Sequence, residues 1–323
     1  MKKKIIDLWT LNKLKQEFNY GSIEIGNLGP EILESQIKKN CLMMSASEMR
    51  NFLHFLPLMI GHKIREEDDK KKWSVILQLI EISEISMQSV ISREDLEKLD
   101  KLIKSYLSNR SKQYNQPMKP KHHFLLHYKA CIDHSGPIRN LMCFSYEQMN
   151  RIVKRYGKIS YQRIDLSWSL MSKRIMHHHR FIEDHKNGFP LEIECFQKKI
   201  IKTTAQFLRG KNYFSNEMFS EDDDVYILDG LKYRGTFFRR GYHIATQNEK
   251  MQCYLILDIL KNEILYFVVD EIQIIQYDEH KLCFNVGQSL QNFKLILIHN
   301  LDFYPFNLHK TVDGNLSIRL KRI

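Results

Sequence analysis

Apolar residues recur at helical spacing through the first third of the chain, and this pattern predicts three amphipathic helices. The first follows a capping box formed by Ser45 and Glu48, and it is expected to kink at Pro57. The second is predicted at residues 73–85 and the third at residues 92–107. We interpret the apolar stripes of all three helices as core-forming faces rather than as ligand sites.

The segments around these helices are polar or are interrupted by glycine and proline. Residues 1–29 are predicted to be extended or loop-like, and the charged run at 65–72 is predicted to be a loop. A polar linker is expected at 108–120. Further helices are predicted at residues 123–133, 145–156, 162–183 and 192–207.

The hydrophobic pattern changes after the acidic run at 221–224. Short runs rich in β-branched and aromatic residues then alternate with turn signals such as Asp229-Gly230 and Asp313-Gly314. This spacing predicts a small antiparallel β-barrel or sandwich. The whole chain is therefore expected to be an α+β protein with a helical segment (1–115), a basic helical segment (116–210) and a β-rich segment (211–323).

Charge is distributed unevenly along the chain. The 323 residues carry 49 Lys and Arg and 38 Asp and Glu, a net charge of +11. Residues 101–210 hold 21 of these basic residues but only 7 of the acidic ones, a net charge of +14, while the flanking parts are close to neutral. A basic block this localised predicts a surface that faces a polyanion. A solvated lysine-rich face is the alternative.

Composition excludes several other classes of protein. The chain is 43% hydrophobic with only 13 Gly and 7 Pro, which argues against disorder or a fibrous repeat. Its 6 cysteines form no CxxC pair, so neither a disulfide framework nor a cysteine-based zinc site is predicted. The N-terminus lacks the apolar core of a signal peptide, and no apolar run is long enough to span a membrane. We therefore expect a soluble intracellular protein that has no membrane partner.

Histidines and one glutamate in the basic segment are candidates for metal chemistry. His123 and His127 are four residues apart and would share a helix face, with His122 as an alternative partner for His127. Two imidazoles do not complete a structural zinc site, so a surface role is favoured for them. Glu147 would lie in the first turn of a helix, where a carboxylate is stabilised by the helix dipole, but it could also bind a catalytic metal.

Nine motifs are spread along the chain: FNYG (18–21), MSASEMRNFLHFLPLMIG (44–61), KPKHHFLLHY (119–128), GPI (136–138), FSYEQMNRIVK (144–154), LDGLKYRGTFF (228–238), ILYFVVDEI (264–272), YDEHKLCFNV (277–286) and LSIRLKRI (316–323). Together they resemble the C-terminal halves of DDE transposases of the CACTA/EnSpm-like group and their animal relatives. The resemblance covers nearly the whole chain, and each motif is degenerate.

The resemblance implies an RNase H-like core with an α-helical insertion, two catalytic Asp, one catalytic Glu and a zinc element. Glu147 matches the third catalytic carboxylate. His123 (or His122) with His127 matches the histidine half of the zinc element. The family's two Asp and its CxxC lie upstream of the FNYG motif, and only 17 residues precede Phe18 here. Zinc and magnesium are therefore expected only together with an upstream half.

The resemblance and the charge together predict a truncated, transposase-derived protein that is catalytically inactive, nuclear, and bound to DNA through its basic segment. Two alternatives remain open: a protein-interaction module, as a homo-oligomer or with a protein partner, and one part of an active transposase whose N-terminal half is missing. The candidate DNA-phosphate contacts are Lys119, Lys121, Arg139, Arg151, Lys154, Arg155, Lys158, Arg163, Lys173 and Arg174.

Overall fold

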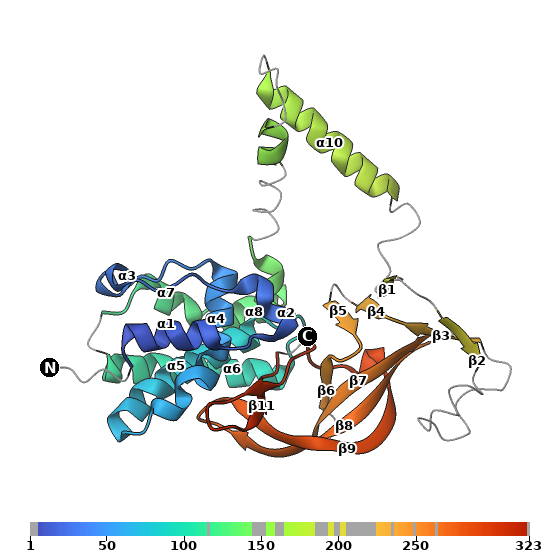
Figure 1. Ribbon diagram of the computed structural model, residues 1–323. Helices are drawn as coiled ribbons and strands as arrows, with labels where there is room; N and C mark the ends of the chain where they lie inside the picture. Colours follow the sequence, from blue (N-terminus) through green and yellow to red (C-terminus); the bar gives the residue numbers. More distant parts are fainter. Residues whose placement is uncertain are drawn as a thin grey trace.

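The computed structural model shows an α+β protein with a helical body packed beside an antiparallel sheet (Figure 1). It describes residues 6–114, 117–143, 153–158, 165–184, 193–196, 201–204, 224–233, 236–247, 250–261 and 264–321. One long helix, α10, lies apart from both bodies in Figure 1. No helix in these ranges is long and apolar enough to cross a membrane.

The helical body comprises the helices between residues 8 and 141. Residues 153–158 are also helical. The α-helices are α1 (Leu8–Glu17), α2 (Gly21–Glu24), α3 (Glu34–Lys38), α4 (Ala46–Ile60), α5 (Glu67–Ser86), α6 (Arg93–Gln113), α7 (Pro120–Leu125), α8 (Tyr128–Ser135) and α10 (Leu166–Asp184). The 3-10 helices are η1 (Ile25–Asn27), η2 (Gly61–Lys63), η3 (Ile138–Leu141) and η4 (Ile298–Asn300).

The predicted starts of α4 and α6 are confirmed. Ser45 accepts a hydrogen bond from the Glu48 amide, and the Glu48 carboxylate accepts one from the Ser45 amide, so the capping box forms. Ser92 caps α6 by accepting a hydrogen bond from the Asp95 amide. Helix α4 continues through Pro57 to Ile60.

Two segments predicted to be loops are helical instead. In the segment 1–29, Asp7 caps α1 by accepting hydrogen bonds from Thr10, and the apolar face of α1 packs against the core of the helical body. Asn12 holds the helix in place because its side chain bonds both backbone groups of Ile32. The prediction of an extended or loop-like segment was wrong because the Asp7 cap starts a helix that ends before the glycines at 21, 26 and 29.

The charged run at 65–72 forms the first turns of α5 rather than a loop. Its acidic residues Glu67, Asp68 and Asp69 occupy the first helical turn, where the helix dipole favours negative charge. The lysines that follow pair back along the helix, Lys70 with Glu67 and Lys71 with Asp68. The run is therefore a charged helix start. Helix α6 likewise extends to Gln113, into the predicted linker.

The β-rich part consists of antiparallel strands, as predicted for residues 211–323, and it also includes two strands at 193–196 and 201–204. They are β1 (Ile193–Phe196), β2 (Ile201–Thr204), β3 (Asp224–Leu228), β4 (Gly230–Tyr233), β5 (Thr236–Arg239), β6 (His243–Gln247), β7 (Met251–Lys261), β8 (Leu265–Asp278), β9 (Cys283–Leu297), β10 (His309–Lys310) and β11 (Leu316–Ile318). The large sheet has the order β10-β11-β9-β8-β7-β3-β2, with β6 also pairing with β7, and the small sheet has the order β1-β4-β5.

The described strands do not close into a barrel. The chain leaves the large sheet at Asp229 and enters the small sheet at Gly230, where a Cβ atom would meet the Phe237 ring at 2.9 Å. The small sheet then packs against the large one through a shared core that includes Phe238 and Phe267, whose rings are 5.5 Å apart. The arrangement is two packed open sheets.

The helix predicted at 192–207 is wrong, because its described residues form strands. β1 pairs with β4 and β2 pairs with β3, both antiparallel. β1 has only four residues, Ile193–Phe196. A segment this short does not show whether its hydrophobic residues follow a strand period or a helical one. Pairing with residues 20 to 40 positions later in the chain decided the outcome. The predicted helix at 162–183 is confirmed as α10 for its described part.

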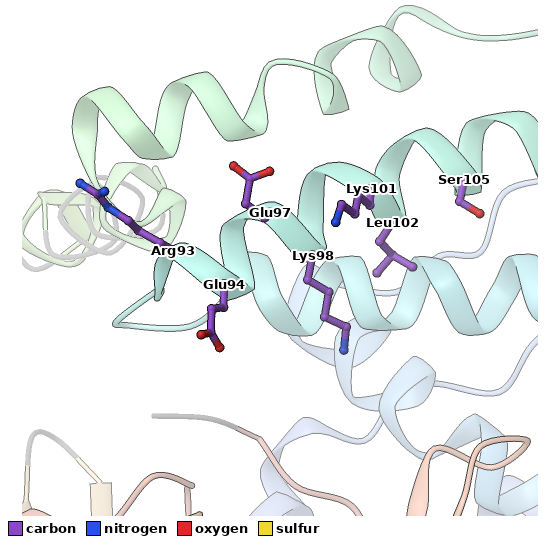
Figure 2. Close-up of a pocket in the computed structure, with 7 residues that line it drawn as sticks. All are labelled: Arg93, Glu94, Glu97, Lys98, Lys101, Leu102 and Ser105. Atoms are coloured by element: carbon purple, nitrogen blue, oxygen red, sulfur yellow. The ribbon is translucent and has the colours of Figure 1, made fainter.

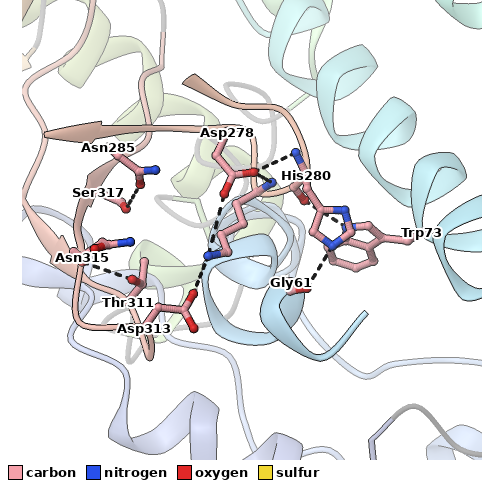
Figure 3. Close-up of polar contacts among 10 residues, drawn as sticks. Gly61, Trp73, Asp278, His280, Asn285, Thr311, Asp313, Asn315 and Ser317 are labelled. Atoms are coloured by element: carbon pink, nitrogen blue, oxygen red, sulfur yellow. Dashed lines mark hydrogen bonds and ion pairs between the residues drawn. The ribbon is translucent and has the colours of Figure 1, made fainter. Parts of the chain in front are cut away.

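The helical body and the sheet are joined at the turn between β8 and β9 (Figure 3). The buried Trp73 ring of α5 donates a hydrogen bond from Nε1 to the His280 carbonyl at 3.0 Å, and His280 Nε2 lies 3.0 Å from the Gly61 carbonyl. Within the β-rich part, Lys281 of the same turn pairs with Asp313 of the β10–β11 turn at 2.7 Å. Cys283 of β9 lies within the core of the helical body. The two parts therefore share a core.

His243 of β6 gives the sheet an expected sensitivity to acid. Burial lowers its pKa from 6.5 to about 4, and its Nδ1 is buried without a partner among the described residues. The unfolded chain therefore takes up this proton first as the pH falls, so folding stability should decline below pH 6.5 until about pH 4. The contribution of His243 is on the order of 3 kcal/mol.

The variant His243→Phe keeps a ring stacked on Phe306 but cannot be protonated. Urea unfolding between pH 4 and 7 should show a weaker pH dependence for this variant than for the wild type. His134→Phe, at an exposed position, is the matched control for replacing a histidine by phenylalanine. Equal pH dependence for His243→Phe and the wild type would show that folding does not lower the pKa of His243.

Candidate functional site

The histidine cluster lies at a corner between α7 and α8. The helix predicted at 123–133 is interrupted at Leu126 and His127, and this break brings His123 Nε2 to 3.1 Å from His127 Nε2. His122 points elsewhere, since its Nδ1 accepts a hydrogen bond from the Lys119 amide. The sequence thus identified a true His123–His127 pair, although the two residues do not share one helix.

This pair does not amount to a complete zinc site within the described residues. A tetrahedral zinc ion needs four donors, and no group of three or more His, Cys, Asp or Glu side chains suited to a metal occurs in the described ranges. Glu147, the predicted carboxylate, lies outside the described residues, as do Arg151 and Arg163. We therefore derive no metal chemistry from this corner.

The other predicted basic residues fall into four separate places. Lys119 and Lys121 lie with the histidines at the start of α7, and both are exposed. Lys154, Arg155 and Lys158 are exposed on the short helix at 153–158, and Lys173 and Arg174 lie on α10. Arg139 lies on η3, against the body of the protein.

Arg139 connects the helical body to the C-terminal part of the chain. Its Nη1 donates to Ser89 Oγ at 2.9 Å and to the Tyr304 hydroxyl, and its guanidinium lies 5.7 Å from the centre of the Tyr304 ring. Neither partner carries a negative charge. Arg139 therefore lies at the edge of a large cleft without a carboxylate partner among the described residues.

This cleft, which we call the interbody cleft, lies between the helical body and the sheet. It has a volume of about 1470 Å³. Its walls come from α2, α4, α5, η3, β5 and the loop around Tyr304. The lining residues include Ser22, Glu24, Asn27, Ser45, Ser47, Arg50, Asn51, Ser83, Arg139, Asn140, Phe237, Tyr242, Tyr304 and Lys321.

A network of buried charges supports the wall of the interbody cleft. Glu84 of α5 receives hydrogen bonds from His54 Nδ1 at 2.8 Å and from Arg319 Nη2 at 2.7 Å. Burial, followed by the charges of Arg319 and Lys321, lowers the pKa of His54 well below its usual value. His54 is therefore neutral, and it must carry its proton on Nδ1 to donate to Glu84.

Two of the cleft cations were missed by sequence reasoning. Arg50 and Lys321 lie in the motifs at 44–61 and 316–323, outside the basic segment from which the candidate phosphate contacts were drawn. Only the packing of α4 against the C-terminal strand region brings them together with Arg139. The only local signal for Arg50 is that it occupies a polar position on an amphipathic helix. Any solvated residue occupies such a position, so this signal does not mark a functional residue.

Helix α10 differs in charge from the helices of the helical body. From Leu166 to Ile182 it contains no acidic residue, whereas Lys173, Arg180 and the three histidines at 177–179 are all exposed.

On α6, by contrast, acidic and basic side chains lie next to one another along a shallow hollow of about 700 Å³ (Figure 2). Lys98 there pairs with Glu81 at 3.4 Å, and Lys104 pairs with Asp100 at 2.6 Å.

Comparison with protein-family models, with curated proteins and with solved structures found no match to this chain. Its relationship to DDE transposases thus remains a hypothesis from the sequence motifs.

Proposed function

We infer that this protein binds DNA through its basic middle segment, with α10 as the main contact. The observation that carries this proposal is the charge of α10, where exposed cations and imidazoles follow one another without an intervening carboxylate. Such a helix places several positive charges within reach of successive phosphates. Exposed Trp168 on the same helix adds an aromatic surface of the kind that stacks on bases.

The resemblance to DDE transposases favours DNA over other polyanions as the target, and a nuclear location is part of the same proposal. The residues at 119–121 and 153–158 would extend the basic surface beyond α10. Binding that rests on phosphate contacts discriminates weakly between sequences. We therefore expect a strong dependence on salt and little dependence on DNA sequence.

The variant Lys173→Gln, Arg174→Gln, Arg180→Gln tests this proposal. Glutamine keeps helix propensity close to that of lysine and arginine, so α10 should persist. Fluorescence anisotropy across a salt series should show a weaker DNA affinity. The slope of log affinity against log salt concentration should decrease by about 0.9 for each phosphate that the variant no longer neutralises.

The matched control is Lys70→Gln, Lys71→Gln, Lys72→Gln, which removes the same charge from the exposed start of α5. Those lysines lie among carboxylates, so their replacement should leave DNA affinity nearly unchanged. Equal DNA affinity of the α10 variant and the wild type at every salt concentration would contradict the proposal. So would wild-type binding that does not respond to salt.

A further inference from the structure

The interbody cleft holds more positive than negative charge that is free to act on a ligand. Lys321 pairs with Glu24, so these two charges cancel locally. Arg50 has neither a hydrogen bond nor an ion pair with any residue in the described ranges, and the partners of Arg139 are neutral hydroxyls. Two guanidinium groups thus line one cleft without a hydrogen-bonded carboxylate, and Glu84 and Glu24 offset the charge of Arg50 only from beyond ion-pair distance.

The positive charges of Arg50 and Arg139 repel each other. Burial, followed by the nearby charge of Arg139, lowers the pKa of Arg50 below its usual value. Like charges brought together at a partly buried position cost free energy unless an anion offsets them. The packing of the surrounding elements, rather than any attraction between them, holds these two groups together.

The N-terminus of α4 opens into the same cleft. Ser45 is the N-cap residue, and Ala46 and Ser47 follow it in the first turn of a 15-residue helix, all three lining the cleft. The amides of Ala46 and Ser47 precede the first hydrogen bond within the helix, so they have no partner there. Amides at this position, together with the helix dipole, favour a bound phosphate. Arg50 lies about one turn further along the same helix.

Aromatic rings complete the opposite wall. Phe237, Tyr242 and Tyr304 line the cleft from the sheet side. Arg239 lies 5.2 Å from the centre of the Phe237 ring and 5.4 Å from that of Tyr242, which adds a further cation near this wall. Flat aromatic surfaces beside guanidinium groups are the side chains that stack on nucleobases.

We propose that the interbody cleft binds a nucleotide, with its phosphate group held by Arg50, Arg139 and the N-terminus of α4 and its base against Phe237, Tyr242 and Tyr304. The ligand is either a free mononucleotide or the phosphorylated end of a nucleic acid strand, since both present a phosphate monoester next to a base. The cleft is separate from α10, so this site does not depend on the DNA binding proposed above.

Isothermal titration calorimetry with AMP, adenosine and inorganic phosphate tests the site on the full chain. AMP should bind with one site per chain, and adenosine should bind about tenfold or more weakly because it lacks the charged group. Arg50→Gln should weaken AMP binding about tenfold or more, whereas Arg65→Gln, at an exposed arginine outside the cleft, should not change it.

A second variant, Ser47→Asp, separates loss of binding from loss of folding. An aspartate in the first turn should stabilise α4 through the helix dipole, yet its charge would repel a phosphate at the same place. Thermal unfolding should thus show a fold at least as stable as wild type, while AMP affinity falls. Absence of saturable AMP binding to the wild type would overturn the proposal, as would unchanged AMP affinity in Arg50→Gln and Ser47→Asp.

The source of the phosphate is decided by competition. If a 5′-phosphorylated oligonucleotide displaces AMP and the unphosphorylated one does not, the ligand is a strand end. If neither displaces AMP, it is a free nucleotide. The α10 variant Lys173→Gln, Arg174→Gln, Arg180→Gln should bind AMP like the wild type, and loss of AMP binding there would contradict a separate site in the cleft.

Discussion

The substitution Glu84→Gln is expected to lower the free energy of unfolding by about 3–5 kcal/mol. Glu84 is the shared acceptor for His54 and Arg319, and the Arg319 side chain is only 1% exposed. Nε and Nη1 of Arg319 are buried without a hydrogen-bond partner among the described atoms, so the Glu84 carboxylate is its main compensation. Glutamine preserves the volume but leaves the buried guanidinium charge without an opposite charge.

Glu81→Gln is the matched control for this prediction, because it makes the same change one turn earlier on α5. Glu81 pairs with Lys98, whose side chain is 60% exposed, and such surface pairs contribute about 0–1 kcal/mol. Urea unfolding at pH 7 measures both variants. Adding Arg319→Met to Glu84→Gln should recover part of the stability, because it removes the unpaired charge. Equal stability of Glu84→Gln and Glu81→Gln would exclude a buried ion pair.

The substitution Trp73→Ala is expected to cost about 3–5 kcal/mol in folding stability. Trp73 is 3% exposed in the core of the helical body, and its Nε1 donates to the His280 carbonyl of the β8–β9 turn (Figure 3). The substitution would create a cavity and leave the His280 carbonyl without this donor. Both effects fall on the contact that joins helices to sheet.

Trp9→Ala serves as the control, since Trp9 is 71% exposed on α1 and its removal should cost less than about 0.5 kcal/mol. Trp73→Phe should lie between the two, because it removes the hydrogen bond but retains most of the ring; a destabilisation of about 1–3 kcal/mol is expected. Urea unfolding followed by circular dichroism measures all three. A cost for Trp73→Ala no greater than for Trp9→Ala would mean that the helical body does not need this contact.

Where local chemistry was decisive, sequence reasoning succeeded. The Ser45–Glu48 box and the Ser92 cap are satisfied within four residues, so the starts of α4 and α6 follow without knowledge of any distant contact. The same reasoning applied to Asp7 and Thr10 would have found α1, because that cap is equally local. The error at 65–72 came from treating a charged run as solvated loop, although acids at its start favour a helix.

Where distant pairing was decisive, sequence reasoning failed. Residues 193–196 and 201–204 were predicted to be helical, and they form strands because β4 and β3 supply their hydrogen-bond partners. Short segments of this kind carry no period long enough to distinguish the two structures. The His123–His127 pair is an intermediate case. Their spacing suggested that the two imidazoles lie close together, and they do, but His123 lies on α7 and His127 lies at the break before α8 rather than on one continuous helix.

By itself, the sequence determined the α+β composition, the capped helices and the basic block at 101–210, because these depend on residues close together in the chain. The tertiary structure alone decided the interbody cleft and the buried network behind it. Arg50, Arg139 and Lys321 are separated by more than 80 residues from one another, and Glu84 meets Arg319 across 235 positions. Contacts at such separation arise from packing of a shared core, which no local pattern encodes.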